Sequence, residues 1–522
     1  MSRQLSTLFR STRPGNDSWL RVSYFPLTKY CWYMLPAVFW IAGTLLCHVL
    51  EAAEPIRLHP DNPHYFLFRG KPTVLVTSAE HYGAVLNLDF DYVRYLEALQ
   101  SNGMNLTRLW PGGPYLEIPG SFNIANNTLA PKPNRFSCIW QRSTTPGYAG
   151  GGSKFDLTRW DDSHLARLKD FVAQAGKRGI VVELSLFCPY YNDKLWDFSP
   201  LKSTNNVNNV GDLPRTQALT LQNGGLLAIQ EGMVRKIVAE LKDFDNLYYE
   251  ICNEPYFGGV TIEWQHHIAD VIREAESSFK DKHLIAQNIA NGSTKVEKPH
   301  SAVSIFNFHY SRPPQSVALN YGLNKVIGLN ETGFDGPSDA AYRIQGWDFI
   351  LAGGALYNNL DYSFTVDRPD GTFQPDPKTP GGGTPALRRQ LQILKDFVHS
   401  FDFVKMTPDA SVIQGGVPAG AVARALVDRG NAYAVYLHHG TPGFGHTDQP
   451  TRSRPEYRVA QGSQETKLDL DLPSGSYKAE WVDTRTGEVG KTEAIKSSGG
   501  RQTLVSPAYN EDIAVRVQRV QH

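Results

Sequence analysis

The stretch Asn246-Leu247-Tyr248-Tyr249-Glu250-Ile251-Cys252-Asn253-Glu254-Pro255 predicts a short buried strand that ends in an amide and a carboxylate. Pro255 cannot donate to a sheet, so we expect the strand to stop there. A carboxyl group at the end of an apolar strand loses solvation, which raises its pKa and favours its protonated form near neutral pH. Glu254 is therefore a candidate general acid, and Asn253 can hydrogen-bond a substrate hydroxyl without adding charge.

A second strand of the same kind, residues 326–330, is followed directly by Glu331, which lies 77 positions after Glu254. Cleavage of a glycosidic bond with retention needs one carboxylic acid to protonate the leaving oxygen and one carboxylate to attack the anomeric carbon. The two strand-end glutamates meet this need, with Glu254 as acid/base and Glu331 as nucleophile. Glu250, deeper in the first strand, is expected to pair within the protein.

Strands and helices alternate through most of the chain, which predicts an α/β protein with a (β/α)8 TIM barrel. The predicted strands are 73–77, 104–110, 180–187, 246–254, 284–287, 304–309, 326–330 and 355–360. The clearest predicted helices are 89–101, 161–177, 225–242, 262–279, 339–351 and 385–399. This order places Glu254 after strand four and Glu331 after strand seven, on the barrel face where active sites of this fold gather.

The pattern predicts three parts: a leader at 1–53, a barrel at 54–406 and an all-β sandwich at 407–522. Short strand-like runs at 56–58 and 64–68 predict a small lid under the barrel. Beyond residue 408 the helical pattern gives way to alternating runs, which are typical of a sandwich. The sandwich is expected to buttress the barrel; the alternative is a carbohydrate-binding module, and Trp481 and Tyr477 could serve either role.

The placement of Asn253-Glu254-Pro255 and Glu331 after two barrel strands resembles clan A of the glycoside hydrolases, and family 5, with its cellulases and mannanases, is the nearest match. The resemblance implies that the first glutamate is the acid/base and the second the nucleophile of a retaining enzyme acting on β-linked glycans. It further implies that Arg108 lies beside Glu331 and that Asn253 contacts the sugar 2-hydroxyl. The strand-eight tryptophan common in this clan is absent, so the chain is expected to be a distant relative.

Other substrate-binding candidates lie at the ends of further strands. These are Glu80 and His81 after strand one, Trp110 after strand two, His309 and Tyr310 after strand six, and Asn358 in strand eight. Adjacent residues of a strand point to opposite sides, so His309 and Tyr310 can share the site only if the chain bends between them. Aromatic residues of the long loops are candidates for sugar stacking or for loop packing: Tyr115, Phe122, Trp140, Tyr148, Tyr190, Tyr191 and Trp196.

The composition excludes several partners and cofactors. Lysine and arginine number 52 and are balanced by 52 acidic residues, so no strong charge recruits nucleic acid or an anionic membrane. The spacing of histidines, cysteines and acidic residues predicts no metal site and no cofactor. Cys138 and Cys188 could form a disulfide, but buried free thiols are an equally good interpretation. The expected partner is an oligo- or polysaccharide.

An apolar run at residues 34–50 follows Arg21 and Lys29 and precedes Ala52 and Ala53. This layout predicts a secretory leader, with an uncleaved membrane anchor as the alternative. We therefore expect a secreted or periplasmic protein. Two functional alternatives stay open on the same residues: a transglycosylase, and a barrel that binds glycans without cleaving them.

Overall fold

The computed structural model describes residues 54–375, 381–441, 457–460 and 462–520. Eight parallel strands form the central sheet in the order β4-β13-β12-β11-β10-β9-β8-β5. Their bounds are β4 Leu75–Ala79, β5 Leu106–Leu109, β8 Val181–Phe187, β9 Leu247–Cys252, β10 Ile285–Asn291, β11 Ile305–His309, β12 Val326–Thr332 and β13 Leu356–Leu360. The Val76 amide donates to the Asn105 side chain at 2.8 Å, and the Trp110 amide donates to the Tyr82 carbonyl at 3.2 Å, so the β4 and β5 edges also meet. The predicted barrel is confirmed.

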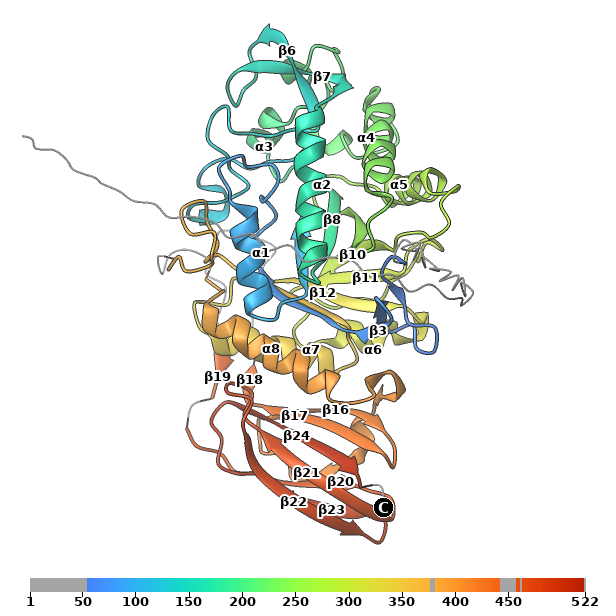
Figure 1. Ribbon diagram of the computed structural model, residues 1–522, viewed down its shortest axis with the longest axis vertical. Coiled ribbons are helices and arrows are strands. Elements are labelled where there is room, and N and C mark those ends of the chain that lie inside the picture. Colours follow the sequence, from blue (N-terminus) through green and yellow to red (C-terminus); the bar gives the residue numbers. More distant parts are fainter. Residues whose placement is uncertain (1–53, 376–380, 442–456, 461, 521–522) are drawn as a thin grey trace, which may run out of the picture. The chain divides into compact units, whose positions relative to one another are not determined.

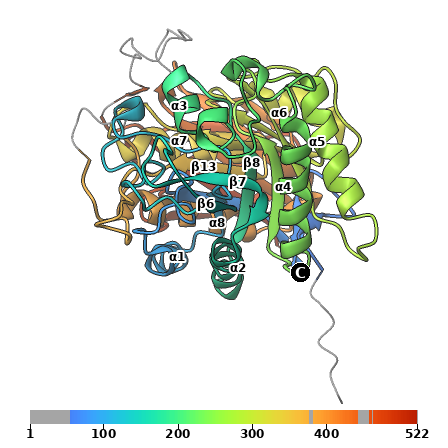
Figure 2. The same ribbon diagram turned by 90° about the horizontal axis from the view of Figure 1, so that it is seen from above.

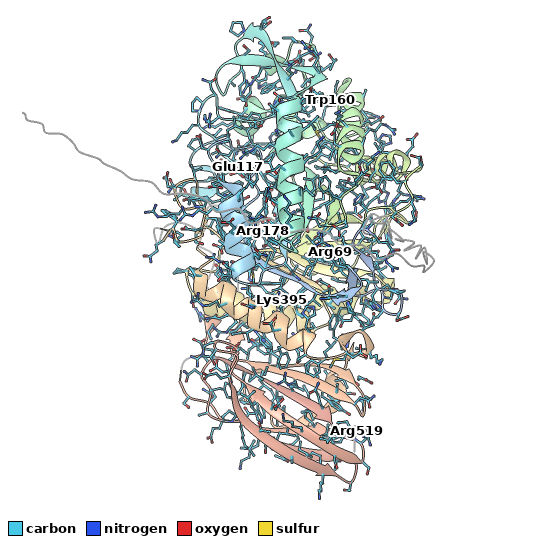
Figure 3. All side chains as sticks on the ribbon, viewed as in Figure 1. Arg69, Glu117, Trp160, Arg178, Lys395 and Arg519 are labelled. Carbon is cyan, nitrogen blue, oxygen red and sulfur yellow. The ribbon has the colours of Figure 1, made fainter. Side chains whose placement is uncertain are left out.

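Helices follow the strands and cover the outside of the barrel, as Figures 1 and 2 show for α1, α2, α4 and α5. Their bounds are α1 Tyr92–Ser101, α2 Asp162–Lys177, α3 Asp193–Phe198, α4 Leu226–Leu241, α5 Ile262–Ala275, α6 Gln315–Asn320, α7 Asp339–Leu351 and α8 Pro385–His399. Several begin at a side chain that accepts a hydrogen bond from the first turn, including Asp91, Asp161, Thr261 and Thr384. Trp160 and Arg178 mark the two ends of α2 in Figure 3, and the Trp160 end lies on the side of the strand carboxyl ends.

A small antiparallel sheet closes the opposite, amino-terminal side of the barrel strands. It consists of β1 Arg57–Leu58, β2 Phe66–Phe68 and β3 Lys71–Thr73. The Ile56 amide donates to the carbonyl of Asp245, just before β9, and Arg69 Nε forms an ion pair with the Asp245 carboxylate at 2.5 Å. The sheet therefore lies where the lid was expected.

The loop expected after the second barrel strand contains a hairpin, β6 Trp140–Pro146 and β7 Ser153–Trp160. Its first strand carries mostly polar residues, and both strands are largely outside the core. The hairpin therefore lacks the alternation of apolar residues from which strands are predicted. Four of the loop aromatic residues are buried, which supports loop packing as their role: Trp140 and Tyr148 after β5, and Tyr190 and Trp196 after β8.

Beyond the barrel, antiparallel strands form two facing sheets, consistent with the expected sandwich. The larger sheet has the order β14-β16-β17-β24-β21-β22, and the smaller has the order β15-β20-β23. The bounds are β14 Thr407–Pro408, β15 Ile413–Gly415, β16 Val422–Asp428, β17 Ala432–His438, β20 Lys467–Asp471, β21 Gly475–Val482, β22 Val489–Ser497, β23 Arg501–Val505 and β24 Asp512–Arg519. A further pair, β18 Gly440–Thr441 and β19 Arg458–Val459, stands apart. The boundary at residues 406 and 407 stays a prediction.

Strand β17 of the larger sheet is buried on both of its faces. Tyr433 and Val435 on β17 join the sandwich core, whereas Ala434 and Tyr436 on the same strand join the barrel core. Tyr436 stacks on Trp347 of α7 with ring centroids 5.3 Å apart. Because α7 has the barrel on one side and this sheet on the other, it is buried around its whole circumference.

Trp481 and Tyr477 are each 1% exposed and belong to the sandwich core. Neither ring is available at the surface to stack on a sugar. Their burial, together with the packing of β17 on α7, supports the buttress interpretation of this region.

The leader expected at 1–53 lies outside the described residues. No helix in the described ranges is long and apolar enough to span a bilayer. Cys138, Cys188 and Cys252 are buried free thiols, so the Cys138–Cys188 disulfide that was left open does not form.

Arg343 of α7 joins the barrel to the sandwich, and its removal should be costly. Its guanidinium, 2% exposed, donates to Asp512 of β24 at 2.6 Å and to Glu511 at 2.5 Å. Arg343→Ala leaves Asp512 charged and buried, which we expect to cost about 3–5 kcal/mol of unfolding free energy. Thermal unfolding measures this loss. Lys405→Ala, which breaks an ion pair whose side chains are 69% and 59% exposed, is the control; equal melting of the two variants would contradict the expectation.

Candidate active site

The carboxyl ends of β9 and β12 bring Glu254 and Glu331 together. Glu331 lies within β12, and Glu254 follows β9 by two residues in a turn where its φ is +38°. A carboxylate oxygen of each glutamate and a ring nitrogen of His309 all lie within 4.8 Å of one another. The two carboxyl groups are therefore close enough to contact one bound molecule together.

Glu331 is surrounded by hydrogen-bond donors. Its Oε2 accepts from the Tyr82 hydroxyl at 2.8 Å and from Arg108 Nη1 at 3.1 Å, and its Oε1 accepts from the Tyr310 hydroxyl at 2.7 Å. These donors come from three different strand ends, so the carboxylate is held in one orientation. Both oxygens of the Glu331 carboxylate are thus occupied by donors.

Glu254 also accepts several hydrogen bonds. The Tyr191 hydroxyl donates to Oε2 at 2.5 Å, and His309 Nδ1 and the Tyr256 hydroxyl each lie 3.2 Å from Oε1. Burial raises the pKa of Glu254, but the hydrogen bond and charge of His309 outweigh it and leave the pKa below its usual value. The expected net rise of the Glu254 pKa is therefore wrong, because the sequence argument considered burial and not the hydrogen-bond donors.

His309 and Tyr310 share the site in spite of being adjacent. Strand β11 ends at His309, and Tyr310 takes a φ of +50°, which supplies the bend that sharing requires. His309 Nδ1 lies 3.5 Å from Glu331 Oε1, the oxygen that accepts from Tyr310. One turn residue thus brings both side chains to the same carboxylate.

Arg108 of β5 binds three glutamates at once. Its Nε pairs with Glu183 at 2.7 Å and its Nη1 with Glu331 at 3.1 Å, while Nη2 binds Glu250. Nη2 also donates to Asn253 Oδ1 at 2.8 Å. Arg108 therefore lies beside Glu331 as expected, and Glu250 pairs inside the barrel as expected.

Glu183 of β8 and Glu250 share a second partner besides Arg108. Asn330 Nδ2 lies 2.6 Å from the Glu183 carboxyl and 2.7 Å from the Glu250 carboxyl. Burial, and then the charge of Glu250, raise the pKa of Glu183 to about 7. The pKa of Glu250 is held below its usual value by Arg108 and Ser185 in spite of burial. Of the two, Glu183 is therefore the glutamate that takes up a proton at the higher pH.

A family model for cellulase (glycosyl hydrolase family 5) matches residues 133–318. This range begins in the loop after β5 and includes Glu254 and His309. Over these residues the chain resembles glycosyl hydrolase family 5. The match supports glycoside hydrolase chemistry and a carbohydrate substrate.

Solved structures share the fold at low sequence identity. A family 5 glycoside hydrolase from Bacteroides vulgatus ATCC 8482 is 14% identical, with a TM-score of 0.55 over 89% of this chain and 94% of its own. A candidate glycoside hydrolase from the same organism is 13% identical, with a TM-score of 0.58 over 90% and 83%. A third glycoside hydrolase is 14% identical, with a TM-score of 0.56 over 89% and 97%. No curated protein matches by sequence.

The remaining predicted residues are placed around this centre. Asn253 donates to the Tyr191 hydroxyl at 3.0 Å, and the Trp110 ring contacts Tyr82 and Tyr115 with centroids 5.0 and 4.7 Å apart. Asn358 is fully buried, and its Nδ2 donates to the Asn330 carbonyl at 2.9 Å, so it braces β12 from inside the barrel.

Glu80 and His81 hold a loop against the end of β4. The Glu80 carboxyl accepts from the Gly83 and Ala84 amides at 3.2 and 3.1 Å and from the Thr128 hydroxyl at 2.6 Å. His81 Nε2 lies 2.7 Å from Asn127 Oδ1. Both side chains therefore meet the loop at 112–130.

Several residues of the site were not singled out by sequence reasoning: Tyr82, Glu183, Glu117, Asn127 and Tyr256. Tyr82 directly follows Glu80-His81, and its φ of +81° marks a backbone turn that no sequence pattern reveals. Glu183 lies in an otherwise apolar strand. A charged residue within such a strand is a signal that could have identified it.

Glu254, His309 and Glu331 come close enough to hold a metal ion between them. Their carboxylate oxygens already accept hydrogen bonds from Tyr82, Tyr191 and Tyr310, and Arg108 supplies a positive charge to Glu331. A second cation would compete with Arg108, so the donor set fits a carboxylate pair better than a metal centre.

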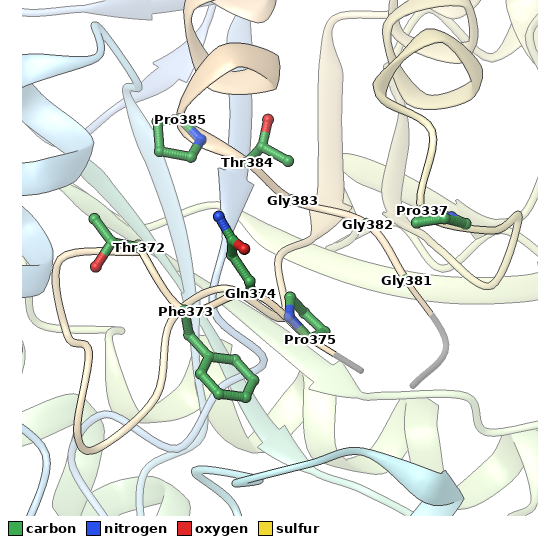
Figure 4. A pocket seen from close by; sticks show the side chains of 10 residues that line it. All are labelled: Pro337, Thr372, Phe373, Gln374, Pro375, Gly381, Gly382, Gly383, Thr384 and Pro385. Atoms are coloured by element: carbon green, nitrogen blue, oxygen red, sulfur yellow. The ribbon is translucent and has the colours of Figure 1, made fainter. Parts of the chain in front are cut away.

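A cavity of about 350 Å³ opens beside the loops that follow β12 and β13 (Figure 4). Pro337, Phe373, Gln374 and Gly381 to Gly383 are among its lining residues. It lies on the carboxyl-end side of the barrel, apart from the two glutamates.

The raised pKa of Glu183 should appear in the pH dependence of stability. A folded-state pKa of about 7 for Glu183, against 4.5 in an unfolded chain, means that the folded state keeps a proton that the unfolded state releases. Stability is therefore lost as the pH rises between these values. Glutamine does not titrate, so we expect the melting temperature of Glu183→Gln to fall less than that of wild type between about pH 5 and about pH 7.

Thermal unfolding of wild type and variant at the two pH values measures this difference. Glu97→Gln is the matched control, because the Glu97 side chain is 59% exposed and should leave the wild-type pH dependence unchanged. An unaltered pH dependence in Glu183→Gln would contradict the raised pKa of Glu183.

Proposed function

We propose that the chain is a retaining glycoside hydrolase that cleaves β-linked glycans, with Glu254 as acid/base and Glu331 as nucleophile. The observation that carries the proposal is the pair of buried carboxylates, which have a carboxylate oxygen each within 4.8 Å of the other and lie on one face of the barrel. Part of this barrel matches a cellulase family model. The leader pattern at 1–53 supports export to the periplasm or beyond.

The surroundings of the two glutamates support different roles. Arg108, Tyr82 and Tyr310 all donate to Glu331 and hold its carboxylate in one orientation, as a nucleophile requires. Glu254 accepts its hydrogen bonds from Tyr191, Tyr256 and His309, and none of these partners is an arginine.

The reaction then follows two steps. The protonated Glu254 carboxyl donates its proton to the glycosidic oxygen while a Glu331 oxygen attacks the anomeric carbon, and the bond to the leaving group breaks. In the second step the Glu254 carboxylate removes a proton from water, the water oxygen attacks the anomeric carbon, and Glu331 leaves. Asn253, fixed by Arg108 and Tyr191, can hydrogen-bond a hydroxyl of the same sugar.

Azide distinguishes the two glutamates. We expect Glu331→Ala to lose several orders of magnitude in kcat on aryl β-glycosides and to regain turnover with azide, giving a glycosyl azide of inverted configuration. Glu254→Ala is the matched variant: azide replaces the water that no longer has a base, so its product keeps the β configuration. NMR of the two products reads out the configuration.

Comparable activity of Glu331→Ala without azide would overturn the assignment. Longer oligosaccharides in place of free reducing ends would identify a transglycosylase. Binding of glycans without cleavage by the wild-type protein would identify a non-catalytic barrel.

In the pH profile of kcat/KM, the pH at which activity falls on the alkaline side (the alkaline limb) should depend on His309. Its hydrogen bond and charge lower the pKa of Glu254, so His309→Phe should raise that pKa and move the alkaline limb to higher pH. Tyr256→Phe removes only a neutral donor from the same oxygen and should move the limb less in the same direction. A limb that stays in place in His309→Phe would show that Glu254 is not the titrating acid.

A further inference from the structure

Tyr256 lies beside Glu254 and is open to solvent. At 36% exposed, it is the most exposed tyrosine, phenylalanine or tryptophan in the part of the chain that the structure describes. Its hydroxyl lies 2.6 Å from Oδ1 of Asn291, the last residue of β10, and 3.2 Å from Glu254 Oε1. One residue thus connects the predicted acid/base to the surface at the mouth of the barrel.

The Tyr256 side chain is held at both ends. Its backbone follows Pro255, whose own ring fixes a backbone dihedral, and its hydroxyl is bound in the turn after β9 and at the end of β10. Phe257 packs beside it with ring centroids 5.0 Å apart, and Phe257 also contacts Tyr191 with centroids 5.8 Å apart. An aromatic ring that is already fixed loses little conformational entropy when a ligand packs on it.

The contacts of Tyr256 place it on the acid/base side of the site. Glu331, the predicted nucleophile, is held by Tyr82, Arg108 and Tyr310. Tyr256 instead hydrogen-bonds Glu254, whose proton goes to the glycosidic oxygen in the proposed reaction. Because that oxygen departs with the leaving group, the open surface beside Glu254 borders the leaving group and not the sugar that Glu331 attacks.

The chemistry of this surface fits a sugar ring. An aromatic ring presents an apolar face, on which the C–H groups of a pyranose face can pack. Burial, and then the charge of Glu254, raise the pKa of the Tyr256 hydroxyl well above its usual value. The phenol therefore stays neutral, and it adds no charge that would repel or attract a substrate.

We propose that the Tyr256 ring binds the first sugar of the leaving group by packing on its C–H face, so that the preferred substrate is a β-linked oligosaccharide whose leaving group is itself a sugar. The proposal rests on the proposed glycosidase function and deepens it. An acceptor must approach the anomeric carbon from the side on which the leaving group departs. The same ring therefore binds acceptor sugars when the enzyme transfers a glycosyl group.

Two substitutions separate the ring of Tyr256 from its hydroxyl. Tyr256→Phe removes the hydroxyl and keeps the ring, whereas Tyr256→Leu removes both and leaves an apolar side chain. One substrate is a β-linked oligosaccharide that the wild type cleaves, and the other is the β-glycosyl fluoride of the same sugar, whose leaving group is a single atom. Comparing the two variants cancels the loss of the hydroxyl, and comparing the two substrates shows which side of the bond the ring contacts.

We expect kcat/KM for the oligosaccharide to be about threefold to tenfold lower in Tyr256→Leu than in Tyr256→Phe, while the two variants cleave the glycosyl fluoride alike. Leu319→Ala is the surface control, because Leu319 of α6 is 50% exposed, and it should match the wild type on both substrates.

Equal cleavage of the oligosaccharide by Tyr256→Leu and Tyr256→Phe would overturn the proposal. An equal loss on both substrates in Tyr256→Leu would also overturn it, because the ring would then contact the sugar that is transferred. A wild-type protein that cleaves neither substrate would instead overturn the proposed function.

Reactivation of a trapped enzyme gives a second measurement. A 2-fluoro sugar with a fluoride leaving group bonds to Glu331 and releases fluoride, which leaves a slowly hydrolysed glycosyl ester. An added methyl β-glycoside then frees the enzyme: its hydroxyl oxygen bonds to the anomeric carbon, its proton passes to Glu254, and the bond to Glu331 breaks.

We expect the acceptor concentration for half-maximal reactivation to be about threefold to tenfold higher in Tyr256→Leu than in Tyr256→Phe, with reactivation by water alone the same in both. Equal half-maximal concentrations in the two variants would overturn the proposal.

Discussion

One guanidinium serving three buried carboxylates is the constraint on which this barrel depends. Arg108 can neutralise one charge, yet Glu183, Glu250 and Glu331 all contact it. Taking such charges out of water costs several kcal/mol of free energy for each ion. The negative charge that Arg108 does not balance must therefore be neutralised by a proton or stabilised by hydrogen bonds from neutral donors. Both are found here: burial raises the pKa of Glu183 to about 7, and Asn330 donates to Glu183 and Glu250.

The barrel strands also make the site rigid. Glu331, Arg108 and His309 belong to barrel strands, and each is buried and held by at least two partners. A site built on strands keeps its geometry better than one built on loops. The long loops add a second group of contacts: the Tyr191 hydroxyl binds Glu254, and the Asn127 amide binds His81. Glu254 and His81 lie in turns just beyond the strands, so their side chains depend on these loop contacts for part of their support.

Much of this architecture could be predicted from the sequence, because buried parallel strands are continuous apolar runs and Asn253-Glu254-Pro255 interrupts one of them. Strands with polar faces could not: β22 is mostly exposed, and the hairpin β6–β7 carries little apolar alternation. Partners across the barrel were equally hidden, since Glu183 meets Asn330 across 147 positions of sequence. The predicted direction of the Glu254 pKa shift was wrong for the same reason, because the shift depends on donors from other parts of the chain.

The pairing of β4 with β13 has a consequence for synthesis on the ribosome. Asn359 Nδ2 donates to Ser78 Oγ across 281 positions, so the first barrel strand has no partner on this edge until the last has been translated. At about 5–20 residues per second this interval lasts roughly 14 to 56 seconds. An unpaired strand edge is a site for association with other chains. The nascent chain therefore needs protection over this interval, and chaperone demand should end once β13 has left the exit tunnel.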